Sequence, residues 1–207
     1  MEQLYIAFAR NKFLQSRLNW LDNSVGLKCN NPIIVASLPS IIEDLKCQGT
    51  KYGSVMDYYE SMNLINIQAF SRLDLSSIHI DVVPVDETGS VTIFVFTEDS
   101  HKVIYAPCDV KPFPEYDIFM DADCLIIGNT IVGEVLKDGF VLEKDNPLRD
   151  ELFVMEDIIA LKNKYHIKRV IITHLEEDWG KSYDDYANLQ KQYNGIEFAY
   201  DGLEINY

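Results

Sequence analysis

The stretch IITHLEEDWGKS, residues 171 to 182, runs from β-branched residues into a histidine and then into a cluster of charges. The charged residues after His174 are Glu176, Glu177, Asp178 and Lys181. Imidazole and carboxylate groups are ligands that zinc and manganese take in proteins. A histidine at the end of a buried strand, next to carboxylates, therefore indicates one corner of a metal site. The acidic residues also suit a solvated loop that leads into the next helix, and both interpretations stay open.

The elements that must position these residues alternate along the first half of the chain. PIIVAS, residues 32 to 37, predicts a short apolar strand. In LPSIIEDLKCQG, Ser40 and Glu43 have the spacing of a capping box, which predicts a helix that ends at Gly49. SVMDYYESMNLI, residues 54 to 65, predicts a second helix. The alternation of Ile78, Ile80 and Val82, followed by VTIFVFTE and KVIYAP, predicts a three-stranded meander.

The second half predicts strand–helix–strand crossovers, which favour parallel pairing. ADCLIIGN and IKRVIITH are buried strands, and DELFVMEDIIALKNKYH is an amphipathic helix between them. SYDDYANLQKQY predicts a helix with Ser182 as its N-cap, and IEFAYDGLEI predicts a strand pair around Asp201 and Gly202. No linker or repeat interrupts the chain, so the sequence predicts one α/β domain over residues 1–207 with a mixed sheet.

The order of these elements resembles the metallo-β-lactamase superfamily, and above all its phosphodiesterase-type branch, which includes the phosphonate-utilisation phosphodiesterases. KVIYAPCDVK looks like that family's strand ending in a metal-bridging aspartate, here Asp109, and IKRVIITHLEED like the strand carrying its last metal-binding histidine, here His174. The likeness covers nearly the whole chain, most strongly residues 100 to 207. It implies an αββα sandwich, incomplete at the N-terminal side, with a metal-dependent hydrolase site.

The family's signature is an HxHxDH loop whose ligands hold two metal ions, and this sequence departs from it. Measured back from PIIVAS, the loop falls at FARNKF, where the ligand positions are Phe8, Arg10, Lys12 and Phe13. None of these side chains binds zinc or manganese well. The family's intermediate histidine falls at Asp86.

The histidine count leads to the same conclusion independently. The four histidines are His79, His101, His166 and His174. His79 alternates with apolar neighbours, which predicts a surface position, and His101 lies in a predicted turn. His166 ends a predicted helix, where the helix dipole favours it. These residues cannot supply the histidines of a dinuclear centre, so we expect none.

Asp86, Asp109 and His174 are the three candidates for a reduced metal site. They could hold a single zinc or manganese ion with a water in the fourth position, and Asp109 and His174 would then be the catalytic residues. The alternative is that Asp109 and His174 form a hydrogen-bonded polar pair at the strand ends. We favour this alternative and expect no cofactor.

Four residues are candidates for binding a ligand without a metal. Arg10 and Lys12 place positive charge where the family places metal ions, and Glu176 and Lys181 belong to the loop after His174. Guanidinium and ammonium groups bind carboxylates and phosphates, so a small anionic ligand is expected. Arg10 and Lys12 would equally suit an exposed, frayed terminus.

Composition excludes several classes of protein. The net charge is −15 and the pI about 4.5, which opposes binding to a nucleic-acid backbone. The four cysteines form no CxxC pair, and Cys124 lies within an apolar run that predicts a buried thiol. No secretory leader and no apolar run of about 20 residues is present. We therefore expect a cytoplasmic protein that does not bind membranes.

Two functions from different classes follow. The first is a degenerate protein of this fold that binds a ligand or partner without hydrolysing anything. The second is a phosphodiesterase-like hydrolase with a mononuclear site or a site completed across an oligomer interface. The apolar stretch LYIAF near the start of the chain favours burial against a second copy, which predicts a homodimer with residues 1 to 20 in its interface.

Overall fold

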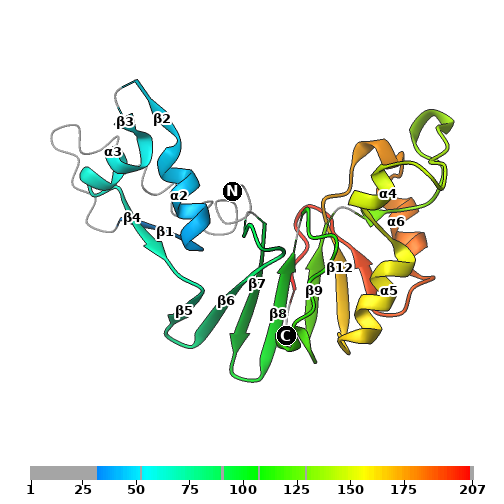
Figure 1. Ribbon diagram of the computed structural model, residues 1–207. Helices are drawn as coiled ribbons and strands as arrows, with labels where there is room; N and C mark the ends of the chain where they lie inside the picture. Colours follow the sequence, from blue (N-terminus) through cyan, green and yellow to red (C-terminus); the bar gives the residue numbers. More distant parts are fainter. Residues whose placement is uncertain (1–31, 52, 90, 107, 129, 206–207) are drawn as a thin grey trace. The chain divides into compact units, whose positions relative to one another are not determined.

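A computed structural model describes residues 32–51, 53–89, 91–106, 108–128 and 130–205 (Figure 1). The chain divides into two compact units. One extends to Ser71 and includes Glu87–Ser90, and the other comprises Arg72–Asp86 and Val91–Tyr207. The single domain expected from the sequence stays a prediction, and so does the dimer interface, because residues 1 to 20 lie outside the described residues.

The first unit is built around a parallel pair of strands and two short helices. Its elements are β1 (Ile33–Ser37), α2 (Pro39–Cys47), β2 (Gly49–Thr50), β3 (Gly53–Ser54), α3 (Val55–Ser61) and β4 (Ile65–Ala69). β1 pairs with β4 in parallel, and α2 buries Ile41, Ile42 and Leu45 as its spacing predicts. The second predicted helix is shorter than expected, because residues from Ile65 onward pair with β1 instead.

The predicted capping box of α2 is wrong. Helix α2 starts at Pro39 with Leu38 as its N-cap, so Ser40 lies inside the first turn and caps nothing. The Ser40 hydroxyl donates instead to the carbonyl oxygen of Gly89, at 3.5 Å. Proline fixes φ near the helical value and needs no hydrogen-bond acceptor, so it starts the helix before the serine is reached.

The second unit contains a seven-stranded mixed sheet in the order β13-β12-β9-β8-β7-β6-β5. The strands are β5 (Arg72–Leu75), β6 (Ile78–Pro84), β7 (Thr92–Glu98), β8 (His101–Ala106), β9 (Cys124–Ile127), β12 (Arg169–Ile172) and β13 (Ile196–Phe198). Strands β5 to β8 are antiparallel, and β8, β9, β12 and β13 run parallel. The predicted meander and the predicted mixed α/β fold are confirmed.

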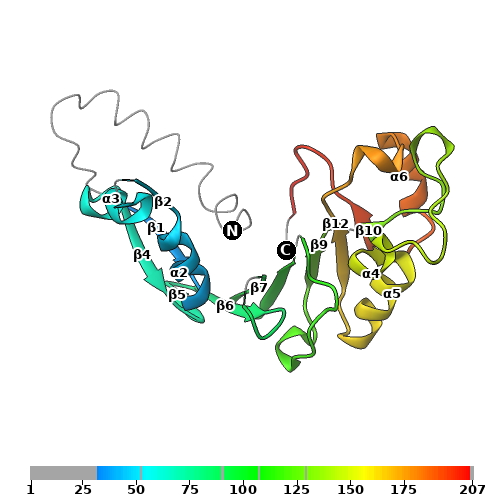
Figure 2. The same ribbon diagram turned by 45° about the horizontal axis from the view of Figure 1, so that its top comes forward.

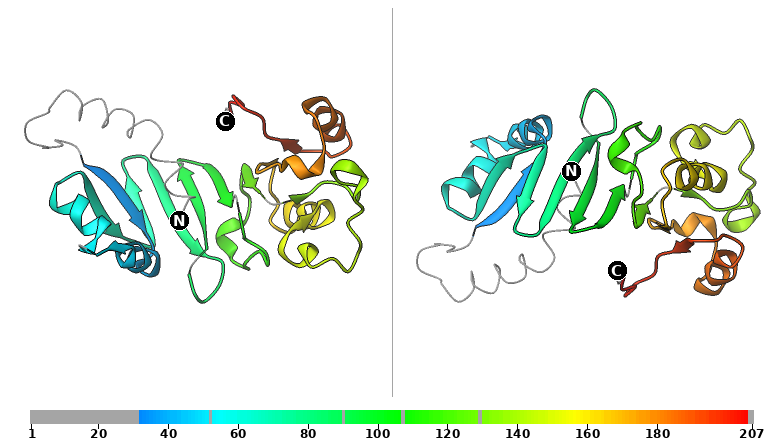
Figure 3. Two further views of the ribbon diagram at one scale, coloured as in Figure 1. Left: turned by 90° about the horizontal axis from the view of Figure 1, so that it is seen from above. Right: turned by 90° about the horizontal axis from the view of Figure 1, so that it is seen from below.

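Two helices of this unit lie beside the parallel half of the sheet (Figures 1 and 3). Helix α5 (Met155–Lys164) buries Met155 and Ile158 in the main core, together with Leu125 and Ile172 of the sheet. Helix α6 (Tyr183–Gln190) packs on β13. Ser182 is its N-cap, as predicted, and its hydroxyl accepts a hydrogen bond from the backbone N–H of Asp185 at 3.3 Å.

The helix predicted over residues 150–166 is split. Its first part forms the end of α4 (Leu148–Glu151), and β11 (Phe153–Val154) pairs in parallel with β10 (Thr130–Ile131) before α5 begins. Both α4 and α5 contact β11, next to β10 (Figure 2). Pairing with β10 holds the backbone of Phe153 extended and buries its side chain in the core. This tertiary contact outweighs the local helical pattern of the sequence.

The predicted strand pair around Asp201 and Gly202 is wrong in its second strand. Only β13 forms, and Leu203 instead donates its N–H to the Tyr200 carbonyl oxygen at 3.0 Å, in a turn. β13 pairs in parallel with β12 at the edge of the sheet, and both Ile196 and Phe198 are buried.

Cys124 is fully buried, as predicted. Among the described residues, no helix is long and apolar enough to cross a membrane.

Candidate functional site

The parallel strands bring Asp109 and His174 to the same edge of the sheet. The last residues of β8, β9 and β12 are in register, Ala106 with Ile127 and Ile127 with Ile172. Asp109 follows β8 and His174 follows β12, with only β9 between the two strands. Ligands of α/β sheets bind at this carboxyl edge. The expected position of His174 at the end of its strand is confirmed.

Asp109 and His174 share an uncommon backbone conformation. Their φ angles are +53° and +54°, in the left-handed region that residues other than glycine seldom adopt. Each residue turns the chain within three positions of the strand end. Such conformations cost free energy, so packing around the two residues must hold them in place.

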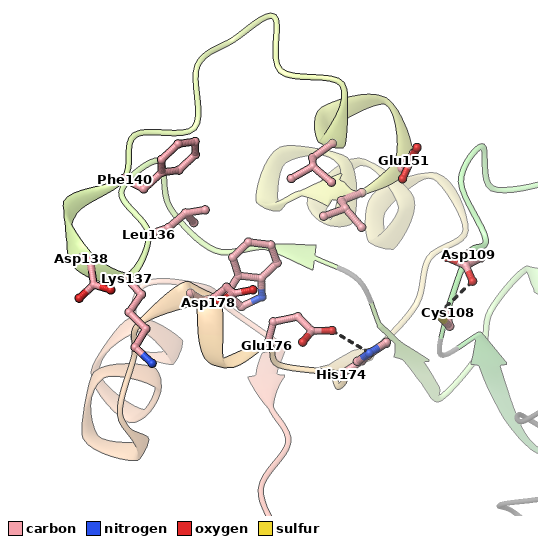
Figure 4. A pocket seen from close by; sticks show the side chains of 13 residues that line it. Cys108, Asp109, Leu136, Lys137, Asp138, Phe140, Glu151, His174, Glu176 and Asp178 are labelled. Atoms are coloured by element: carbon pink, nitrogen blue, oxygen red, sulfur yellow. Dashed lines mark hydrogen bonds and ion pairs between the residues drawn. The ribbon is translucent and has the colours of Figure 1, made fainter.

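Both residues line one cavity of about 570 Å³ (Figure 4). Its acidic residues are Asp109, Asp138, Glu151, Glu176 and Asp178. Its apolar residues are Leu136, Phe140, Leu148, Leu152 and Trp179. The volume lies within the range of about 300–1,000 Å³ that small-molecule sites occupy. The cavity lining thus combines acidic residues with aliphatic and aromatic ones.

His174 and Asp109 each have a close polar neighbour of their own. His174 Nε2 lies 2.8 Å from Glu176 Oε1, and the Cys108 thiol donates to Asp109 Oδ2 at 3.2 Å (Figure 4). Both side chains of the His174–Glu176 pair are about half exposed. One imidazole nitrogen of His174 is therefore used by a carboxylate from its own loop.

Trp179 anchors the wall of the cavity. It ends the short helix η3 (Glu177–Trp179), is 4% exposed and packs with Ile131 and Leu142. An ion pair between Lys137 and Glu177 joins η3 to the neighbouring turn η2 (Lys137–Gly139). The indole N–H of Trp179 has no hydrogen-bond partner among the described residues.

Gly180 makes the approach of these two turns possible. Its φ is +62°, and a Cβ atom placed on it would lie 3.0 Å from the Cα atom of Lys137. A side chain would therefore meet backbone atoms, which cannot move aside as a flexible side chain could. The sequence indicated only a backbone-shaping role for Trp179 and Gly180.

Lys111 binds the segment around α4, which carries the cavity residues Leu148, Glu151 and Leu152. Its ammonium donates to the carbonyl oxygens of Arg149 and Leu152, at 2.7 and 2.8 Å, and lies 3.4 Å from Asp157 Oδ2. Lys111 follows Asp109 by two residues. One short segment therefore carries Asp109, which lines the cavity, and Lys111, whose ammonium group binds the end of α4. The sequence alone gave no signal for this role.

The other predicted site residues are not gathered in this cavity. Asp86 follows β6 at the same sheet edge but does not line the cavity, and Lys181 lines a second one. Arg10 and Lys12 lie outside the described residues. Within the described part of the chain, no group of three His, Cys, Asp or Glu residues is placed to hold one metal ion. The apolar wall from residue 136 to 152 was not predicted, because its residues follow no helix or strand period.

No family model matches this sequence, and no curated protein matches it. Solved structures do match. A diphosphatase from the PhnP family is 13% identical over 86% of this chain and 60% of its own, with a TM-score of 0.55. Zinc-bound PqqB from Methylobacterium extorquens is 15% identical over 85% of this chain and 63% of its own, with a TM-score of 0.56.

A third structure, YhfI from Bacillus subtilis, is described as a metallo-β-lactamase fold protein. It is 14% identical over 84% of this chain and 64% of its own, with a TM-score of 0.55. This chain has the metallo-β-lactamase fold. It spans less than two thirds of the length of each of these three proteins. The cavity with Asp109 and His174 lies at the carboxyl edge of this metallo-β-lactamase-like sheet.

Proposed function

We propose that this protein uses the metallo-β-lactamase fold to bind a small molecule and does not hydrolyse it. The observation that carries the proposal is the 2.8 Å contact between His174 Nε2 and Glu176 Oε1 inside the cavity. A carboxylate at this nitrogen competes with any metal ion for it. Of the three metal ligands expected from the sequence, Asp86 does not line the cavity, so only Asp109 and His174 are gathered there. A structural or catalytic zinc needs at least three protein ligands.

The charge of the lining favours a cationic ligand. Five acidic residues line the cavity, whereas its lysine, Lys137, is already ion-paired with Glu177. A small anion would be repelled by these carboxylates, and a cation would be attracted. The small anionic ligand expected from the sequence depended on Arg10, Lys12 and Lys181, none of which is among the described lining of this cavity.

The apolar wall complements an organic cation better than a bare metal ion. An ammonium group could lie among Asp109, Glu176 and Asp178 while its apolar part contacts Phe140 and Leu136. Aromatic faces attract organic cations by their quadrupole, and contact with aliphatic groups removes apolar area from water. The ligand class that fits is therefore a small amine or quaternary ammonium compound with an apolar part.

The hydrolytic alternative is tested with metal and a phosphodiester. Protein purified without chelator is analysed for zinc, manganese and iron, and then assayed with bis(p-nitrophenyl) phosphate in the presence of added zinc or manganese. We expect substoichiometric metal and no turnover above that of the His174→Ala and Asp109→Asn variants. One metal ion per chain, with turnover that both substitutions abolish, would establish the hydrolase instead.

Binding is tested with benzyltrimethylammonium as the probe. The chain has two tryptophans, so a Trp20→Phe variant leaves Trp179 as the reporter of fluorescence from the cavity wall. We expect saturable quenching by this cation and none by benzoate. Glu176→Gln should weaken the quenching, and Glu98→Gln, a change away from the cavity, should not. Equal effects of the cation and the anion would contradict the proposal.

A further inference from the structure

A second cavity, of about 660 Å³, lies at the same sheet edge, and His174 lines both cavities. It is formed by α6, by β13 and by the segment that follows β13 to Leu203. Its volume is within the range of small-molecule sites. Lys181, a candidate ligand-binding residue from the sequence, lines this cavity. Nothing in the function proposed above uses it.

Aromatic rings make up much of the wall. Tyr186 of α6 and Phe198 of β13 have ring centroids 5.0 Å apart, and Tyr183 and Tyr200 meet edge to face at 5.6 Å. Tyr183 and Tyr200 are at least half exposed, so their faces are open to a ligand, whereas Phe198 is buried. Planar aromatic molecules pack well on such rings in offset or edge-to-face arrangements.

The charges of the wall specify the ligand further. Lys181 makes no ion pair with any described residue, and its ammonium lies 3.5 Å from the carbonyl oxygen of Trp179. The carboxylate of Glu197 is already bound by the guanidinium of Arg169, at 2.6 and 2.7 Å. Asp201 adds one further carboxylate. The ammonium group of Lys181 attracts an anion, and the carboxylate of Asp201 disfavours a ligand with more than one negative charge.

The hydroxyl of Tyr186 is a further polar group of a residue that lines this cavity. Its oxygen is buried and has no hydrogen bond to any residue that the structure describes. Burial, and then the charge of Asp185, raise the pKa of Tyr186, so the hydroxyl keeps its proton and can donate. Buried hydroxyl groups in native proteins nearly always form a hydrogen bond. The Tyr186 hydroxyl can therefore donate to an acceptor atom of a ligand.

We propose that this second cavity binds an aromatic carboxylate. The ring would pack between Tyr186 and the exposed faces of Tyr183 and Tyr200, with the carboxylate held by Lys181. The Tyr186 hydroxyl, which is buried, would donate to an acceptor of the ligand once its side chain rotates toward the cavity. The proposal does not rest on the amine site, because Lys181, Tyr186 and the other aromatic residues that it uses line this cavity and not the first one.

Isothermal titration calorimetry with three naphthalene compounds of matched shape tests the proposal. They are 2-naphthoate, neutral 2-naphthalenemethanol and 2-naphthylmethylammonium. We expect one 2-naphthoate per chain, bound about tenfold more tightly than the alcohol, because a hydrogen bond to a charged group contributes that much. Saturation by benzyltrimethylammonium should not displace it. No saturable heat with 2-naphthoate up to about 1 mM would overturn the proposal, and so would a preference for the ammonium compound.

Substitutions locate the binding. Lys181→Met and Lys181→Gln should abolish the preference for 2-naphthoate over the alcohol, while Tyr186→Phe should weaken the binding of both compounds. Lys191→Met, which removes an exposed lysine of the same helix region, should leave all affinities unchanged. Circular dichroism checks that each variant is folded. If the Lys181 variants are folded and keep the full preference, or if Lys191→Met loses it equally, the assignment is wrong.

Discussion

His174 Nε2 lies 2.8 Å from Glu176 Oε1, so the histidine that the fold brings to its carboxyl edge is paired with a carboxylate two residues along the chain. Both side chains are about half exposed. Pairs of this kind contribute about 0.2–1 kcal/mol to stability, since water already solvates the two groups well. The pair therefore affects the chemistry of the cavity more than the stability of the fold.

A Glu176→Gln substitution tests this separation. We expect the free energy of unfolding in urea to change by less than about 1 kcal/mol. The affinity for benzyltrimethylammonium should fall, because one of the five acidic residues that line the cavity loses its charge. A variant that unfolds far more readily would show that the pair is structural, and would remove the basis for assigning it to ligand binding.

The close approach of Gly180 to the backbone of Lys137 predicts that a methyl group at position 180 lowers the stability of the fold more than one at Gly202. Gly180→Ala and Gly202→Ala both place alanine at positive φ, +62° and +89°, which costs about 1–2 kcal/mol. A Cβ at Gly202 meets nothing within 4 Å, whereas one at Gly180 meets backbone at 3.0 Å. We expect Gly180→Ala to be the more destabilising by at least about 1 kcal/mol in urea unfolding. Equal losses would mean that the two turns can separate freely.

We expect Lys111 to stabilise the fold, although lysine side chains usually lie on the surface and contribute little to stability. Lys111→Met keeps the aliphatic stem but leaves the carbonyl oxygens of Arg149 and Leu152 without this donor. The expected loss is about 1–3 kcal/mol, the usual cost of leaving partly buried polar groups unpaired. Lys144→Met, an exposed change in the preceding loop, should cost less than about 0.5 kcal/mol. Chemical denaturation of both variants checks the prediction, which a similar midpoint for the two would contradict.

Asp123 predicts how stability depends on pH. Its carboxylate is bound by the Lys168 ammonium at 2.6 Å and by the backbone N–H of Lys102 at 2.8 Å, and these contacts hold the pKa of Asp123 below its usual value. A carboxyl group whose pKa is lowered by folding stabilises the protein above its unfolded pKa of about 4. This contribution is lost as the pH falls through the lowered value in the folded state.

An Asp123→Asn variant should therefore be less stable than the parent at pH 7. The difference between the two should shrink as the pH falls below about 4, because protonation removes the same charge from the parent. Thermal unfolding at a series of pH values measures the difference. Asp99→Asn, in an exposed turn, serves as the control. A difference that stays constant down to low pH would show that the hydrogen-bonding shape of Asp123, and not its charge, is what matters.

The sequence by itself determined the elements whose pattern is local. Alternation of Ile78, Ile80 and Val82 predicted a strand because side chains of a strand alternate between its faces, and Ser182 predicted a cap because a hydroxyl can reach an N–H three residues away. The buried strands that end before Asp109 and His174 could also be recognised. Parallel pairing then implied that both residues lie at one edge, which the register of β8, β9 and β12 confirms.

Only the tertiary structure decided which groups those residues meet. The approach of Gly180 to Lys137, the pairing of β11 with β10, and the contact of Lys111 with α4 each join residues about 20 to 45 positions apart. No local periodicity encodes such contacts, because they depend on where whole segments are packed. The same packing places Lys181 and Glu176, which belong to one loop, in the linings of two different cavities.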